Sequence, residues 1–209
     1  MSKGVLIVGG ILLLGVGIAV AYLLLSKETI KNVPLASSGP ILFFGDSLVE
    51  GVGATAGHNL PSILSRLVGE PVLNYGVSGD TTKLALARLS AARSEKPKLV
   101  LVLLGGNDFL QKVPREEIFD RLEKIILGFQ GDGAAVVLIG VRSGLIGGGA
   151  DKEYETLAEK TKSLYIEDAL KGVFGNVSLM SDAIHPNDRG YEKIAERIVE
   201  EIRPILTSH

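Results

Sequence analysis

A serine, a histidine and an aspartate in this sequence have the residue types needed to activate a hydroxyl group. Ser47 lies in Gly-Asp-Ser-Leu at 45–48, directly after the apolar run at 41–44, and is the best candidate for a nucleophile. His185 lies in Ser-Asp-Ala-Ile-His-Pro at 181–186, with Asp182 three residues before it. One turn of backbone can therefore bring the Asp182 carboxylate onto the imidazole nitrogen that faces away from Ser47. The pattern predicts Ser47 as nucleophile, His185 as base and Asp182 as its partner.

Three groups are candidates for stabilising an oxyanion, the charge that forms when a hydroxyl attacks a carbonyl. The backbone N–H of Ser47 can point at the substrate oxygen, because the residue lies where a strand gives way to a helix. Gly79 offers an unhindered N–H, and Asn107 offers a side-chain amide. We therefore expect Ser47, Gly79 and Asn107 to form a three-donor oxyanion hole.

Each of these motifs alone is common in turns and helix caps, and several neighbouring polar residues have simpler interpretations. Asp46, Asp80 and Asp108 are expected to organise loops as hydrogen-bond acceptors. Glu50 and His58 are expected to be solvated loop residues. The order of the motifs and their shared position after strands favour a catalytic site over turn chemistry.

The elements that must position these residues are predicted from hydrophobic patterning. Apolar runs typical of buried parallel strands lie at 41–44, 71–75, 98–104, 134–140 and 163–166. Helical patterns lie at 59–68, 81–95, 114–130, 151–162 and 187–206. Alternating strands and helices predict a three-layer α/β/α sandwich around a parallel five-stranded sheet. Ligands bind such sheets beyond the carboxyl ends of the strands, where the candidate residues lie.

Two other glycine-containing sites do not fit. The nucleophile elbow of α/β-hydrolases needs Gly-x-Ser-x-Gly, and Val49 occupies the second glycine position. The glycine-rich segment at 144–149 lacks the Gly-Lys-Ser/Thr ending of a phosphate-binding loop. We expect this segment to form a flexible lip on the substrate pocket.

Composition limits the classes of partner. The chain has 209 residues and a formal net charge of -2, without a basic cluster interleaved with aromatic residues. One well-buried domain is therefore expected, and nucleic acid is not expected as a partner. The absence of cysteine excludes disulfides, thiolate metal sites and a cysteine nucleophile.

The N-terminal segment differs from the rest of the chain in hydropathy. The 21 positions from Val5 to Leu25 carry no charged residue, and a segment of this length can span a membrane as a helix. A cleavable signal peptide is the main alternative, but this apolar run is longer than such peptides usually have. We predict a membrane anchor at 1–25, a linker at 26–39 and a catalytic domain at 40–209.

From Pro40 onward the sequence resembles an SGNH/GDSL hydrolase. The segments at 43–53, 74–82, 103–108 and 181–186 match family blocks that carry the nucleophile Ser47, the oxyanion groups Gly79 and Asn107, and the pair Asp182 and His185. The second and third blocks are most similar to the bacterial arylesterase, acyl-CoA thioesterase and lysophospholipase branch. The resemblance implies a flavodoxin-like sheet, acyl ester or thioester substrates, no cofactor and no metal.

The expected function is that of a serine esterase with a Ser-His-Asp triad and an acyl-enzyme intermediate. Its expected partners are a small acyl ester or a lysophospholipid, and the membrane through the N-terminal helix. Two alternatives remain open: a deacetylase or acyltransferase acting on cell-wall glycans, and a non-catalytic anchored binding protein. The family resemblance implies an extracytoplasmic catalytic domain.

Overall fold

A parallel five-stranded sheet forms the centre of the protein. The computed structural model describes residues 29–36, 38–141 and 149–208. The strand order is β2-β1-β3-β4-β5, and each neighbouring pair is parallel. The strands are β1 (Ile41–Gly45), β2 (Val72–Gly76), β3 (Leu99–Leu103), β4 (Ala135–Ile139) and β5 (Leu164–Ile166). The prediction of a parallel five-stranded α/β fold is confirmed.

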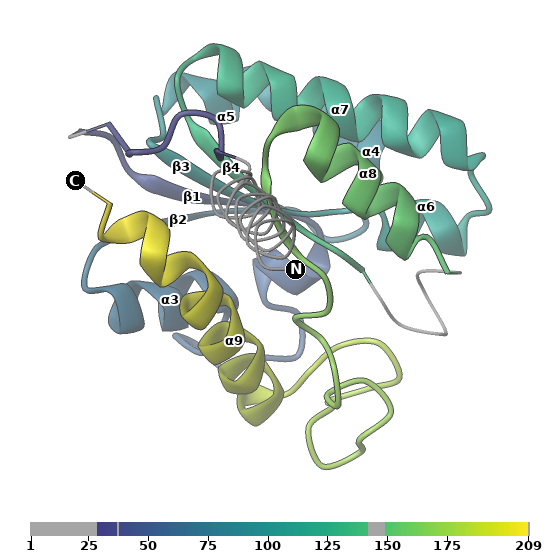
Figure 1. Ribbon diagram of the computed structural model, residues 1–209. Coiled ribbons are helices and arrows are strands. Elements are labelled where there is room, and N and C mark those ends of the chain that lie inside the picture. The colour runs from purple at the N-terminus through teal and green to yellow at the C-terminus, as the bar shows by residue number, and fades with distance from the viewer. Residues whose placement is uncertain (1–28, 37, 142–148, 209) are drawn as a thin grey trace, which may run out of the picture.

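Helices cover both faces of this sheet, which gives three layers (Figure 1). One face packs against α4 (Thr82–Ala87), α5 (Leu89–Ser94), α7 (Arg115–Gly131) and α8 (Asp151–Thr161). The other face packs against α3 (Leu60–Val68) and α9 (Asp188–Leu206). Two short helices, α2 (Ser47–Glu50) and α6 (Gly106–Leu110), follow β1 and β3. Hydrophobic patterning gave no residue range for these two helices, because each spans little more than one turn.

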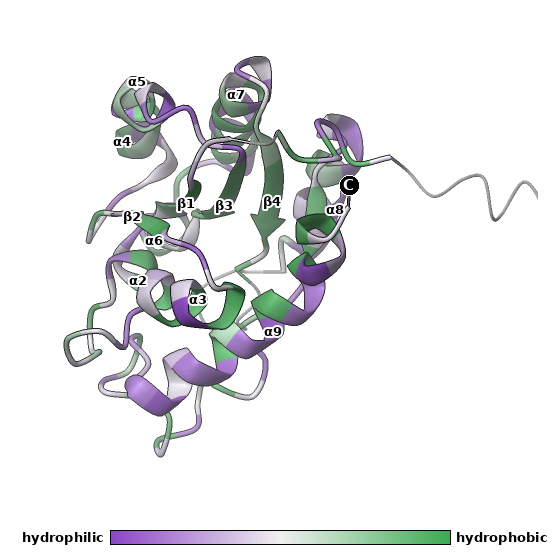
Figure 2. Ribbon diagram, turned by 90° about the vertical axis from the view of Figure 1, so that its left-hand side faces the viewer, coloured by the Kyte–Doolittle hydropathy of each residue, from purple (hydrophilic) through white to green (hydrophobic). Residues whose placement is uncertain are grey.

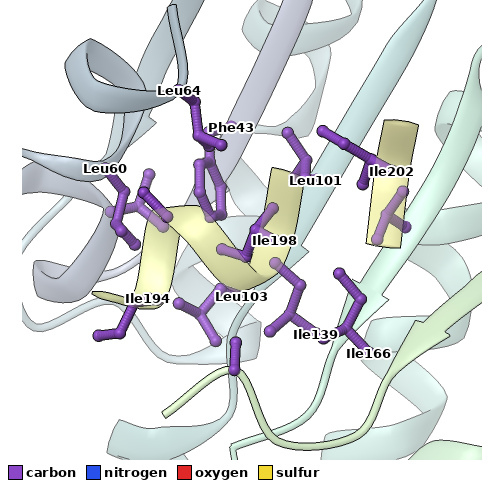
Figure 3. Close-up of a cluster of buried hydrophobic side chains, with 14 of the residues drawn as sticks. Phe43, Leu60, Leu64, Leu101, Leu103, Ile139, Ile166, Ile194, Ile198 and Ile202 are labelled. Carbon is purple, nitrogen blue, oxygen red and sulfur yellow. The ribbon is translucent and has the colours of Figure 1, made fainter. Parts of the chain in front are cut away.

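The three central strands are buried on both sides, which explains their uninterrupted apolar runs. Every residue of β1, β3 and β4 is buried, and Figure 2 shows these strands as hydrophobic along their length. Alternate side chains point to opposite faces, so Phe43 and Leu101 join the cluster beneath α9, whereas Phe44 joins the cluster beneath α7. Figure 3 shows the first of these clusters, where Ile194, Ile198 and Ile202 of α9 meet the sheet.

The helix expected at 81–95 is divided into α4 and α5, which corrects the prediction of one continuous helix. Arg88 separates them with a non-helical backbone (φ -102°, ψ 7°). Its guanidinium donates to the Asp80 carboxylate at 2.6 Å and to the Gly45 carbonyl at 2.9 Å. Through these contacts Arg88 links the end of β1 to the loop that follows β2. The helix is interrupted at the residue that makes these contacts.

The described part of the segment before β1 lies against the domain. Ile30, Val33 and Leu35 pack on the core beneath α9. The Asn32 side-chain amide donates to the carbonyls of Gln130 (3.0 Å) and Ala134 (2.8 Å). This segment, residues 30–36, is called the N-terminal strap below.

The membrane anchor expected at 1–25 lies outside the described residues. Among the residues that the structure does describe, no helix combines the length and the apolar character needed to span a bilayer. The anchor and the domain boundaries at 26 and 40 stay predictions.

Candidate active site

The carboxyl ends of β1, β2 and β3 bring the candidate residues to one edge of the sheet. The first helical residue after β1 is Ser47, and the Asp46 carboxylate caps α2 by accepting from Leu48 N–H at 3.0 Å. Gly76 ends β2 so close to α2 that a Cβ there would lie 2.0 Å from the Glu50 nitrogen. The helix that follows β1 and the end of β2 are therefore held in close contact.

Ser47, His185 and Asp182 form one chain of contacts. The Ser47 Oγ lies 3.1 Å from His185 Nε2, and His185 Nδ1 lies 2.7 Å from Asp182 Oδ2. The other Asp182 oxygen accepts from the backbone N–H groups of Ile184 and His185, both at 2.7 Å. The imidazole contact, followed by the two backbone hydrogen bonds, lowers the pKa of Asp182 to about 2. The carboxylate is therefore ionised at neutral pH and fixes the orientation of the imidazole.

Backbone contacts hold the loop that carries His185. The His185 carbonyl accepts from Ser181 N–H at 2.8 Å, and Met180 pairs with Pro186 in an isolated β-bridge. On the following helix, the Tyr191 hydroxyl donates to the Val52 carbonyl at 2.7 Å. The loop that carries His185 is thus tied to the loop that follows Ser47, although the two lie far apart in the sequence.

The three expected oxyanion donors lie on this edge as well. Within the described ranges, neither Ser47 N–H nor Gly79 N–H has a hydrogen-bond partner. Gly79 is exposed and has φ +81°, a conformation that favours glycine. The Asn107 amide donates to the Asp80 carbonyl at 2.9 Å and lies 3.5 Å from Asp46 Oδ2. The bond to the Asp80 carbonyl thus fixes the side chain, and the amide also lies close to Asp46, the residue before Ser47.

The acidic residues that follow the strands organise the loops, as the sequence indicated. Asp108 is fully buried and accepts from Thr82 N–H (2.8 Å) and Thr82 Oγ1 (2.7 Å), so it joins the starts of α6 and α4. Asp80 accepts from Arg88. Asp46 is 3% exposed, and burial raises the pKa of its carboxyl to about 7.

Two charged residues contribute contacts that the sequence interpretation missed. Arg88 was assigned to a helix interior, yet its guanidinium also lies 4.3 Å from the centre of the Phe44 ring, where β1 ends. Glu50 was expected to be only solvated, but its carboxylate accepts from Ser78 N–H. Both partners come from other elements. The only signals in the sequence were that Glu50 lies within the first family block and that Arg88 follows the second.

The structure identifies no metal-binding cluster in the parts of the chain that it describes. The expectation that the reaction needs no metal and no cofactor stays a prediction. Most of the glycine-rich segment expected to form a lip, residues 144–148, lies outside the described ranges.

Known proteins share both the sequence pattern and the fold. The GDSL-like Lipase/Acylhydrolase family matches residues 43–193. Esterase TesA of Pseudomonas aeruginosa is 28% identical over 183 residues, which cover 82% of this chain and 91% of the relative. An arylesterase of Vibrio mimicus is 32% identical over 178 residues, 79% of this chain and 89% of the relative. Thioesterase 1/protease 1/lysophospholipase L1 of Escherichia coli K12 is 28% identical, covering 82% and 86%.

The structural comparison agrees with the sequence comparison. A crystal structure of TesA superposes with a TM-score of 0.75 at 28% identity, and the match covers 80% of this chain and 99% of TesA. The family match includes Ser47, Gly79, Asn107, Asp182 and His185. The chain therefore belongs to the GDSL (SGNH) lipase/acylhydrolase family and is an ester hydrolase of the GDSL type.

Proposed function

We propose that the protein hydrolyses acyl esters or thioesters through an acyl-enzyme formed on Ser47. The observation that carries this proposal is the contact chain from Ser47 Oγ through His185 to Asp182. His185 Nε2 accepts the hydroxyl proton while Ser47 Oγ attacks the carbonyl carbon. Asp182 holds the imidazole in the tautomer that leaves Nε2 free to accept, and stabilises the imidazolium that forms.

The negative oxygen that develops on the substrate is stabilised by the N–H groups of Ser47 and Gly79 and by the Asn107 amide. The imidazolium then gives its proton to the departing alcohol or thiol as the carbonyl bond re-forms, which leaves the acyl group on Ser47. Water, activated by His185, repeats the attack and releases the acid. The reaction uses only groups that lie at this edge of the sheet.

The substrate class that we propose follows the relatives, whose names describe an esterase, an arylesterase and a thioesterase/lysophospholipase. These names share an acyl group carried on oxygen or sulfur. We propose the same acyl chemistry for this chain, with a small ester or a lysophospholipid as substrate.

The direct test is hydrolysis of p-nitrophenyl esters from acetyl to palmitoyl by the full chain in detergent. Replacing the nucleophile in Ser47→Ala should lower kcat more than ~1,000-fold. Ser94→Ala is a matched control, because Ser94 is an exposed residue on α5 whose hydroxyl donates to the Ala91 carbonyl of the same helix. If Ser47→Ala keeps the wild-type rate, the proposal is wrong.

The same assay separates substrate classes. An optimum at long acyl chains, together with fatty-acid release from lysophosphatidylcholine, supports a lipid substrate. An optimum at acetyl, together with acetate release from acetylated glycan, supports the deacetylase alternative instead.

We also propose that residues 1–25 anchor the domain to a membrane on its extracytoplasmic side. The uncharged run from Val5 to Leu25 supports the anchor, and the family resemblance supports the side. Fractionation of cells, followed by protease treatment of intact and permeabilised cells, tests both parts. Recovery of the full chain in the soluble fraction would contradict the anchor.

A further inference from the structure

The segment from Gly76, the last residue of β2, to Asp80 in the following loop is held by hydrogen bonds through all but one of its backbone N–H groups. We call this segment the oxyanion loop. Four of its amides have acceptors: Gly76 N–H bonds Asn74 Oδ1, Val77 N–H bonds the Gly45 carbonyl, Ser78 N–H bonds the Glu50 carboxylate, and Asp80 N–H bonds the Val77 carbonyl. Among the described residues, the Gly79 N–H alone within this loop has no partner. Gly79 therefore presents a free N–H donor at an exposed position of this segment, and it is the donor that the proposed reaction needs.

Burial and packing do not restrain the middle of the oxyanion loop. Val77, Ser78 and Gly79 are exposed, so burial does not hold them. A Cβ placed on Gly79 would meet nothing within 4 Å, so packing does not restrain that residue either. The bond from Asp80 N–H to the Val77 carbonyl at 3.1 Å closes a turn whose central peptide joins Ser78 to Gly79. The peptide before it, between Val77 and Ser78, donates its N–H to Glu50, so Glu50 holds the chain where it enters this turn.

Glu50 is placed for this contact by its own backbone. It is the last residue of α2, the helix that begins with Ser47. The Asn74 side-chain amide donates to the Glu50 carbonyl at 3.2 Å, and Gly76 packs directly against the Glu50 nitrogen. The carboxylate therefore extends from a fixed point of the nucleophile's helix to the oxyanion loop.

We infer that Glu50 is a positioning residue of the reaction, which holds the Ser78 amide so that the Gly79 N–H faces the oxygen of the substrate. In this role Glu50 does not contact the reacting atoms. It fixes the distance between the nucleophile and one oxyanion donor, because it bonds the helix of one to the loop of the other. The inference rests on the proposed function, since it assigns a role within that reaction.

Replacing Glu50 should reduce the stabilisation of the transition state more than it reduces the stability of the fold. The carboxylate is exposed and water competes for its hydrogen bond, so the contact contributes little to stability. Misplacing a catalytic group by about 1 Å can cost roughly 100-fold in rate. For Glu50→Ala we expect kcat to fall roughly 10- to 100-fold, with KM and Tm close to wild type.

Two further variants make the test specific. Glu50→Gln keeps an oxygen that can accept from Ser78 N–H, so it should retain kcat within about threefold of wild type. Glu196→Ala is a matched control, because Glu196 is an exposed glutamate of α9 for which the structure shows no hydrogen bond or ion pair. It should behave as wild type.

The measurement is kcat and KM on a p-nitrophenyl ester, together with the inhibition constant of a trifluoromethyl ketone. Such a ketone forms a tetrahedral adduct on the nucleophile, and its oxyanion occupies the same hole as the transition state. In Glu50→Ala, affinity for the ketone should fall in parallel with kcat/KM. A merely structural role would instead lower Tm and the active fraction, with the inhibition constant of the folded enzyme unchanged.

The outcomes separate this inference from the proposed function. Wild-type activity that does not depend on Ser47 would overturn the proposed function and this inference with it. Wild-type activity that depends on Ser47, combined with a Glu50→Ala variant within twofold of wild type in kcat and ketone affinity, would overturn the role of Glu50 alone. A loss that Glu50→Gln fails to restore would also contradict it, because the role requires only an acceptor.

Discussion

Asp46 lies next to Ser47, the proposed nucleophile, yet its environment disfavours the ionised form. It is 3% exposed, and burial raises its pKa from 3.8 to about 7. An acid whose pKa is higher in the folded state stabilises the fold fully at low pH, and this stabilisation is lost as the pH rises through the folded-state pKa. The difference between 3.8 and 7 corresponds to a stability change of up to ~4 kcal/mol across that range.

Asp46→Asn should remove this pH dependence. The amide keeps an oxygen that can cap α2 at Leu48 N–H but does not ionise. The free energy of unfolding of the wild type should therefore fall relative to that of the variant between about pH 4 and pH 7. Urea unfolding of both proteins across this range measures the effect. Parallel curves would contradict the effect of burial on Asp46.

Asn107→Ala tests the proposed side-chain donor of the oxyanion hole. Loss of one such donor costs about 2.7–4 kcal/mol of transition-state stabilisation, or roughly 100- to 1,000-fold in kcat. The lost hydrogen bond to the Asp80 carbonyl should lower the free energy of unfolding by only about 1 kcal/mol. Steady-state kinetics and thermal melting measure the two effects. Asn176→Ala, in an exposed loop, serves as the control and should leave kcat unchanged.

Residue by residue, the sequence indicated the site best where the contacts are local. Asp182 and His185 are three positions apart, so their contact could be predicted from spacing alone. The contact of Glu50 with Ser78 joins residues 28 positions apart on different elements. Nothing in the local pattern around Glu50 distinguishes it from a solvated glutamate, because its partner is a backbone amide that is placed only by the fold.

At the scale of elements, close packing of α2 on the end of β2 determines the distance between the nucleophile and the oxyanion loop. A Cβ at Gly76 would lie 2.0 Å from the Glu50 nitrogen and 2.5 Å from the Val49 carbonyl carbon. Both are backbone atoms, which cannot move aside as a flexible side chain can. Gly76→Ala should therefore push the two elements apart and lower both stability and kcat.

Gly131→Ala is the matched control for Gly76→Ala. Gly131 is the last residue of α7, and a Cβ there would meet nothing within 4 Å. Alanine in that position should leave kcat unchanged and raise the free energy of unfolding by up to about 1 kcal/mol, because it restricts the unfolded chain. Chemical unfolding and kinetics of the two variants test the comparison. Equal effects of both substitutions would contradict the packing argument.

The strands were the most predictable elements, and the segment from 81 to 95 shows where prediction failed. The five apolar runs correspond to the five observed strands because strands buried on both faces must be apolar throughout. The helical pattern at 81–95 continues through Arg88, although the helix does not. The break depends on Asp80 and on the Gly45 carbonyl, and these tertiary contacts leave no mark on helical periodicity.

For the molecule as a whole, the N-terminal strap runs along the edge where the strands begin. Lys31 N–H donates to the Lys162 carbonyl just before β5, and Asn32 bonds the Ala134 carbonyl just before β4. The candidate catalytic groups lie at the opposite edge, beyond strands that are about 16 Å long. The sequence pattern at 26–39 predicted only a polar linker, because the contacts of Asn32 involve distant backbone carbonyls.

Asn32→Ala should loosen the strap and leave catalysis intact. The variant loses two hydrogen bonds to backbone carbonyls, which should lower the free energy of unfolding by about 1–3 kcal/mol. Hydrogen exchange should become faster in the strap, while kcat at temperatures well below Tm should match the wild type. Lys31→Ala is the control, because the strap bond of Lys31 is made by its backbone. A drop in kcat for Asn32→Ala would show that the two edges are coupled.

The position of the strap has a practical consequence for attaching the protein to a surface. A support or tag attached before Thr29 applies force to the side of the domain where the strands begin. The contacts of the strap transmit this force to the core rather than to the catalytic loops. Ser47, which follows the carboxyl end of β1, then lies on the side of the domain away from the support. An immobilised preparation linked through its N-terminus should thus remain accessible even to bulky substrates, whereas random coupling through surface lysines would block a fraction of the molecules.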